Sequence, residues 1–192
     1  MNKYLTNSKL KKIGFKKIGK NCKISKSIST YNLIGSLGDN IRIDDDVQLK
    51  GKIDLKSNVH IARGCTLSGA KHGIFVDDLV SLANYVQIYS SSDDYYSPSI
   101  AVATLNSEMR KKFSKVYEKK IKIGKCCIIG TLSVLLPGAI IGDFSSIGAL
   151  TIVNKKISKG FFFQSKAKEK LKKRDVKLFE RLYKGYKKLN EN

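Results

Sequence analysis

Aliphatic residues recur at every sixth position over much of this 192-residue chain, and this repeat constrains the fold more than any other feature. The longest unbroken run is Ile123, Ile129, Leu135, Ile141, Ile147 and Val153. Shorter runs begin at Ile43 and Val76. A period of six fits neither an amphipathic helix nor an alternating strand. It fits a chain that makes a short strand, turns a corner and makes another. Three strands per turn predict a three-sided column whose coils stack at about 4.8 Å, the usual strand spacing.

A small residue follows many of these aliphatic anchors. The pair Ile-Gly occurs with its isoleucine at positions 13, 18, 34, 123, 129, 141 and 147. A glycine at a tight corner relieves crowding and permits a positive φ. Each coil needs neighbours to bury its face, so the column needs a cap at each end. We therefore predict a cap and lead-in over 1–26, coils over 27–157, and a basic amphipathic helix over 158–192.

Charge is concentrated at the two ends of the chain. The formal net charge is +21, yet residues 27–154 are nearly neutral. Few of the basic residues are arginine, which argues against base-specific contacts with nucleic acid. No apolar stretch approaches the roughly 20 residues that a membrane span needs, and the N-terminus does not resemble a signal peptide. The four cysteines show no CxxC spacing, so we expect a reduced, cytoplasmic protein.

The stretch IKIGKCCIIGTLSVLLPGAIIGDFSSIGALTIV, residues 121–153, resembles the left-handed parallel β-helix of the hexapeptide-repeat acyltransferases. Within them it is similar to the maltose and galactoside O-acetyltransferase-like group found in surface-polysaccharide gene clusters. The resemblance implies an all-β fold with a long loop, acetyl-CoA as the acyl donor and no metal. It also implies a homotrimer with active sites between subunits. A metal enzyme of the γ-carbonic-anhydrase type needs three histidines, and the chain has two.

The repeat is interrupted over 89–120, and a long loop in a compact repeat is usually functional or disordered. The resembled enzymes place a catalytic histidine where this chain has Asp93, which suggests Asp93 as a general base. Asp94 is a like charge that would raise the pKa of its neighbour. Extra residues near His72 predict a bulge, which would allow a His72–Asp93 pair. The alternative is a solvated loop whose aspartates cap turns.

The resemblance also suggests where the donor binds. Small residues of the later coils would admit the pantetheine arm of CoA, and polar or basic residues after them would hold its phosphates. Corners and stacking require the same small residues in any case, so they indicate the fold more strongly than the ligand. The candidate residues are Gly130, Ser133, Gly148, Ala149, Thr151, Asn154, Lys155 and Lys168.

Three functions follow from these features. The first is acetyl-CoA-dependent O-acetylation of a sugar or surface-glycan hydroxyl. The second is N-acetylation of an amino sugar on the same scaffold. The third is a catalytically silent hexapeptide-repeat protein that binds partners or membrane through its basic ends. The C-terminal segment likewise has two interpretations, a cap on the column or a helix resting on the anionic inner face of a membrane.

Overall fold

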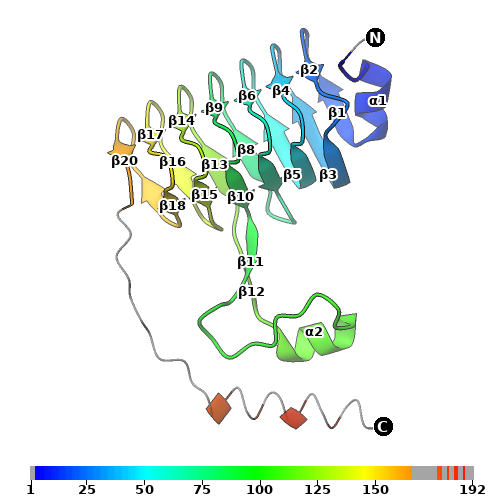
Figure 1. Cartoon of the computed structure of the whole chain (residues 1–192), viewed down its shortest axis with the longest axis vertical. Helices are drawn as coiled ribbons and strands as arrows, with labels where there is room; N and C mark the ends of the chain where they lie inside the picture. Colours follow the sequence, from blue (N-terminus) through cyan, green and yellow to red (C-terminus); the bar gives the residue numbers. More distant parts are fainter. Residues whose placement is uncertain (1–2, 166–176, 179–180, 182–183, 186–187, 189–192) are drawn as a thin grey trace. The chain divides into compact units, whose positions relative to one another are not determined.

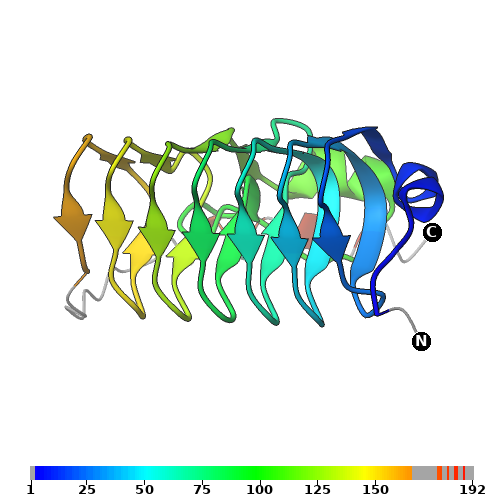
Figure 2. The ribbon, with the colours of Figure 1, turned by 90° about the horizontal axis from the view of Figure 1, so that it is seen from above.

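The computed structural model describes residues 3–165, 177–178, 181, 184–185 and 188. The contacts divide the chain into two units, the first comprising 1–91 and 118–166 and the second 92–117 and 167–192. The first unit is a stack of three-sided coils joined by parallel strand pairs (Figures 1 and 2). This confirms the predicted all-β, left-handed parallel β-helix. Successive strands of each coil lie on a first, a second and a third face.

The first and third faces belong to one 11-stranded sheet, because two long strands turn the corner between them. These are β3 (Ser29–Leu37) and β5 (Gln48–Leu55). The first face also contains β1 (Phe15–Ile18), β8 (Ile74–Val76), β13 (Ile121–Ile123), β16 (Ile140–Ile141) and β19 (Lys156–Ile157). The third face also contains β7 (Thr66–Ser68), β10 (Gln87–Tyr89), β15 (Val134–Leu135) and β18 (Ile152–Val153).

The second face is a separate 7-stranded sheet of short strands. Its members are β2 (Lys23–Ile24), β4 (Arg42–Ile43), β6 (His60–Ile61), β9 (Ser81–Leu82), β14 (Ile128–Ile129), β17 (Ser146–Ile147) and β20 (Phe162–Phe163). The last of these pairs with β17, so the final coil extends to Phe163. This corrects the start of the predicted 158–192 helix. The rest of that segment lies outside the described residues, apart from six scattered ones.

The aliphatic anchors stack in register through the interior. On the third face Leu49, Leu67, Ile88, Leu135 and Val153 are successive partners, and each is fully buried. The prediction that one aliphatic side chain per hexad points inward is confirmed along the runs that begin at Ile43, Val76 and Ile123, whereas Ile34 is 53% exposed and Leu33 is buried instead. Burial of such a side chain stabilises the fold by about 1.5–3 kcal/mol. The stability of the column is therefore spread over many similar contributions.

The corners differ from the prediction in one respect. The left-handed residue lies three positions before an anchor, as at Asn58 before Ile61 (φ 57°) and Leu132 before Leu135 (φ 58°). Apart from Gly14 (φ 125°), the glycines of the Ile-Gly pairs have no positive φ and serve for close approach instead. A Cβ at Gly35 would lie 1.8 Å from the carbonyl oxygen of Ile53 in the next coil. The expected relief of crowding is therefore present, while the expected positive φ lies elsewhere.

Short elements complete the two units. The helix α1 (Asn7–Lys12) precedes β1 and buries Leu10 completely; its N-cap is Thr6. Coil pairing already begins at Phe15, inside the segment assigned to the cap and lead-in. The interruption of the repeat contains β11 (Ser91–Asp93), α2 (Ser107–Phe113) and β12 (Val116–Glu118), with β11 paired to β12. Among the described residues, no helix is long and apolar enough to cross a membrane.

Candidate active site

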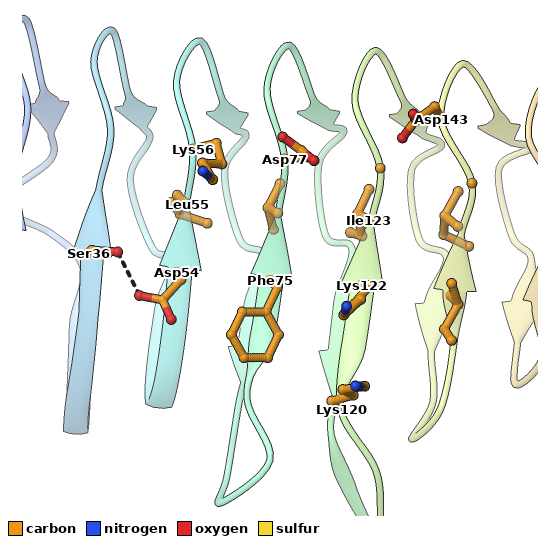
Figure 3. Close-up of a pocket in the computed structure, with 15 residues that line it drawn as sticks. Ser36, Asp54, Leu55, Lys56, Phe75, Asp77, Lys120, Lys122, Ile123 and Asp143 are labelled. Carbon is orange, nitrogen blue, oxygen red and sulfur yellow. Dashed lines mark hydrogen bonds between the residues drawn. The ribbon is translucent and has the colours of Figure 1, made fainter.

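A groove of about 610 Å³ runs along the first face of the column (Figure 3). Phe75 lies outward in the middle of it, between Asp54 on the preceding strand and Lys122 on the following one. The hydroxyl of Ser36 donates a 2.6 Å hydrogen bond to Asp54. Lys120 extends the basic side of the groove. An aromatic ring among charges of both signs suits a ligand that has both flat apolar and ionic parts.

The aspartates of this groove each accept a hydrogen bond, but its charges are not neutralised by ion pairs within the described residues. Among residues 3–165 none of the lysines or aspartates lining it forms an ion pair within 4.0 Å. At the corner Asp143 accepts a 3.1 Å hydrogen bond from the backbone N–H of Lys125. The groove therefore offers unpaired lysine ammonium groups and carboxylates on a rigid surface.

His72 lies in a tight turn at the edge between the third and first faces. The turn closes with a 2.6 Å bond from the Gly73 N–H to the Gly69 carbonyl, and it is the bulge predicted from the extra residues in this hexad. The carboxylate beside His72 is that of Glu118, at 3.6 Å from Nε2. Both side chains are partly exposed. A carboxylate next to an imidazole can orient the ring.

Hydrogen bonds fix the base of the long loop against this turn. Ser90 is fully buried and its hydroxyl donates to the carbonyl of Gly69. The carbonyl of Ser90 in turn accepts a 3.0 Å bond from the N–H of Lys119. The residue after Glu118 is therefore tied to Ser90, which is itself bonded to the His72 turn.

The two aspartates of the loop have different surroundings. Asp93 ends β11 and is partly buried. The Asp94 carboxylate accepts 2.9 Å bonds from the N–H groups of Tyr96 and Ser97. Hydrogen bonds from Ser97 and then Tyr96 lower the pKa of Asp94, which makes it a weaker base. Asp94 thus caps a turn, as the alternative interpretation of this stretch has it.

Five of the proposed donor residues gather at the edge between the second and third faces. Ser133 and Thr151 are fully buried, and the Ser133 hydroxyl donates a 2.9 Å bond to the Gly148 carbonyl. A Cβ at Gly130 would lie 2.4 Å from the backbone nitrogen of Ala149. The Ser133 hydroxyl therefore links two coils, whereas the Thr151 hydroxyl donates a 3.2 Å bond to the Ala149 carbonyl of its own turn. Leu132 and Leu150 are the exposed large side chains of this edge, next to the small residues.

The remaining donor residues lie elsewhere. Asn154 and Lys155 follow β18, beyond the third face, and both are exposed. The Lys155 ammonium lies 4.6 Å from the centre of the Phe163 ring. Lys168 lies outside the described residues. The described donor candidates thus form two groups on opposite sides of the third face.

Sequence reasoning missed Glu118 and the groove. Glu118 belongs to the strand that returns from the loop, so only the β11–β12 pairing reveals its place. Phe75 and Lys122 are strand partners, but the long loop separates them in sequence. Their contact can be predicted only if the strand register is known both before and after the loop. The sequence feature that could have indicated the groove is Phe75, an aromatic residue directly before the anchor Val76.

Two of the four thiols, those of Cys65 and Cys127, are buried packing groups. Cys127 is fully buried beside the anchor Ile129, and burial raises its pKa. Burial also raises the pKa of Cys65 to about 11. Among the described residues no three His, Cys, Asp or Glu side chains are grouped to hold a metal ion.

A stacked three-sided coil with a charged groove and a His–Glu pair at a loop edge defines a hexapeptide-repeat enzyme scaffold. No family model matches the chain. It is 35% identical over 156 residues, 79% of each chain, to an Escherichia coli dTDP-4-amino-4,6-dideoxy-D-glucose acyltransferase. The chain thus belongs to the hexapeptide-repeat acyltransferases and is an acyltransferase.

Solved structures give the same family over nearly the whole chain. The S-to-A variant of AntD, an N-acyltransferase from Bacillus cereus in complex with dTDP-4-amino-4,6-dideoxyglucose and coenzyme A, is 31% identical. Its TM-score is 0.78, with 98% of this chain and 100% of that chain covered. AntD with dTDP and 3-hydroxybutyryl-CoA is 30% identical with a TM-score of 0.78, and 99% and 100% of the two chains are covered.

Proposed function

We propose that this protein transfers an acyl group from a CoA thioester to the amino group of a nucleotide-linked amino sugar. The observation that supports it is the likeness to AntD, which spans nearly the full chain and includes the loop that interrupts the repeat. The E. coli relative is also an acyltransferase of an amino sugar carried on dTDP. The second function foreseen from the sequence, N-acylation, is therefore preferred over O-acetylation of a glycan hydroxyl.

The chemistry requires a neutral amine and a place for its proton. The amine attacks the thioester carbonyl, a C–N bond forms, the C–S bond breaks, and CoA leaves as its thiolate. The extra proton on nitrogen must then be removed. We assign this proton to the imidazole of His72, with Glu118 orienting the ring from 3.6 Å. A positioned general base contributes typically 10²–10⁴-fold to the rate.

Asp93 is the second candidate for the acceptor side. It ends the strand that begins the loop, at the position where the resembled enzymes carry a histidine. The AntD structures with dTDP and CoA include variants in which an aspartate was replaced. A carboxylate of this kind can hold the substrate ammonium before its proton is lost. We propose that Asp93 binds the amine, whereas Asp94 shapes the turn.

For the donor we propose the edge that carries Gly130, Gly148 and Ala149. A thioester arm can approach the backbone there because these residues have small side chains or none. The N–H groups near such a corner are suited to stabilise the negative charge that develops on the thioester oxygen. Asn154, Lys155 and Lys168 would meet the phosphates of CoA. In a homotrimer this edge of one subunit would complete the groove of another.

One experiment separates the amine from the hydroxyl acceptor. The protein is incubated with acetyl-CoA and either dTDP-4-amino-4,6-dideoxyglucose or its 4-hydroxy counterpart, and free CoA thiol is measured. We expect thiol release with the amino sugar and a product resistant to alkaline hydroxylamine, which cleaves esters but not amides. Release only with the hydroxy sugar, as a hydroxylamine-labile product, would overturn N-acylation.

A further inference from the structure

A second hollow, of about 390 Å³, lies at the edge between the third and first faces of the column. Lys50, Lys52 and Lys71 line it. We propose that these three lysines bind the diphosphate of the nucleotide-linked acceptor. This inference rests on the proposed function, because it specifies which part of that acceptor is held and where.

The hollow exists because the backbone bends sharply on two successive coils. Gly51 has φ 70° and lies between two of the lysines, and Ala70 has φ 40° and precedes the third. A Cβ at Gly51 would lie 2.7 Å from the backbone nitrogen of Ala70. The glycine thus lets the two coils meet closely, and lysines 50, 52 and 71 gather at one corner although they come from different coils.

The positive charge of this corner is not neutralised within the described chain. None of the three lysines forms an ion pair with a carboxylate within 4.0 Å among residues 3–165. The ammonium of Lys50 lies 5.3 Å from the centre of the Tyr31 ring, and that of Lys52 lies 5.3 Å from the centre of Phe75. Three neighbouring cations repel one another, whereas a diphosphate with two or three negative charges would bind them together.

The hollow adjoins both parts of the candidate active site. Lys71 directly precedes His72, whose imidazole pairs with Glu118. Lys52 touches Phe75, which lines the groove of the first face. A diphosphate held here would therefore place its attached sugar near His72 and leave the groove for the remainder of the ligand.

This location favours the acceptor over CoA as the source of the diphosphate. The proposed donor residues lie on the later coils, around β14, β15 and β18. Most of them lie at another edge of the column, whereas Asn154 and Lys155 share the edge of the hollow but lie between β18 and β19, on a later coil. The lysine hollow lies on β5 and on the turn after β7, several strand spacings of about 4.8 Å away along the stack.

The test measures binding by calorimetry, without turnover. The ligands are dTDP, inorganic pyrophosphate and CoA, and the variants are Lys50→Gln, Lys52→Gln and Lys71→Gln. The control is Lys23→Gln, an exposed lysine on the second face. We expect each hollow variant to weaken dTDP and pyrophosphate about tenfold, with CoA affinity within twofold of the original protein and no effect of the control.

Two results would overturn the proposal. One is unchanged affinity for dTDP and pyrophosphate in a variant that combines Lys50→Gln, Lys52→Gln and Lys71→Gln, with circular dichroism showing that this triple variant is folded. The other is a loss of CoA affinity in place of dTDP affinity, which would assign the hollow to the donor. Failure of the proposed function looks different, because lysine-dependent dTDP binding would persist while amino-sugar acylation would be absent.

Discussion

Asp44 joins two coils on the second face through one carboxylate. It lies 2.9 Å from Nε2 of His60 on the next coil and accepts a 2.8 Å bond from Nε of Arg42. Burial is the largest influence on the pKa of Asp44 and raises it. The hydrogen bonds from His60 and Arg42 together outweigh burial and leave the pKa lowered. The charged form of this carboxylate therefore stabilises the fold.

The sign of this shift sets a pH dependence. Because the pKa is lower in the folded than in the unfolded chain, the contribution is complete above the unfolded value of about 3.9. It is lost as the pH falls through the lower folded value. We expect Asp44→Asn to reduce the free energy of unfolding by about 1 kcal/mol at pH 7, with a smaller difference at pH 3. Urea denaturation at both pH values measures it, and an equal difference at both would contradict the assignment.

His72 and Glu118 permit a test of the proton route. We expect His72→Ala to lower kcat about 10²-fold or more with little change in KM for acetyl-CoA. Glu118→Gln removes the carboxylate beside the imidazole but keeps a side chain of similar size, so it should lower kcat by less than His72→Ala does, because the base remains but is less well oriented. His60→Ala is the matched control, because His60 lies on the second face. Full activity of His72→Ala would move the base assignment to Asp93.

At the scale of the coil, glycines of two kinds should respond differently to the same substitution. Gly35 has no room for a Cβ, since the Ile53 carbonyl oxygen would lie 1.8 Å away. Gly160 has open space but φ 78°. We expect Gly160→Ala to cost about 1 kcal/mol of unfolding free energy, the usual penalty of a left-handed residue. Gly35→Ala should cost at least about 3 kcal/mol or prevent folding.

Thermal and urea denaturation of the two variants compare these penalties. A smaller loss for Gly35→Ala than for Gly160→Ala would show that coil spacing adapts easily. It would also remove the steric reason given for glycine after the anchors.

The strands of the column were predictable from the sequence where their position is set by the one inward aliphatic side chain of each hexad. Inward aliphatics fix the faces and the stacking, and the partnership of Ile88 with Leu67 follows from counting hexads. The left-handed positions were not predictable in the same way. They are occupied by asparagine in early coils but by Leu79, Phe144 and Leu150 later, so backbone geometry overrides the ordinary preference of the residue.

The candidate site was only partly predictable, for a related reason. His72 could be placed on a bulge by counting, and the loop could be recognised by its length. The groove could not, because Phe75 and Lys122 meet only after a long insertion has left and rejoined the same edge. Outward positions carry no periodic signal, so their partnerships depend on register that the sequence alone does not give across the loop.

At the scale of the molecule, one long edge of the column is unusually apolar. The left-handed tips between the second and third faces carry Tyr85, Leu132 and Leu150, which are 49%, 51% and 70% exposed. The same tips on earlier coils are Asp46 and Gly64. Exposed apolar residues in a row favour contact with another protein surface. We predict that this edge is buried between subunits of a homotrimer.

Light scattering during size-exclusion chromatography tests this prediction. Three chains of 21.4 kDa give a trimer of 64.2 kDa, and we expect that mass for the original protein. The double variant Leu132→Lys, Leu150→Lys should run as a monomer, because six lysines would be buried against apolar surface. Leu79→Lys is the control, since Leu79 is 58% exposed at the edge between the first and second faces and should leave the trimer intact.

The outcomes distinguish an error in the predicted oligomeric state from an error in the predicted interface. A 21.4 kDa species in the original protein would remove the trimer, and with it the idea that one subunit's donor edge completes another's groove. A trimer that persists in the double variant would place the interface on another edge. If the variant is monomeric with an unchanged circular dichroism spectrum, acyl transfer should fall while dTDP binding at the lysine hollow remains, because that hollow is built within one chain.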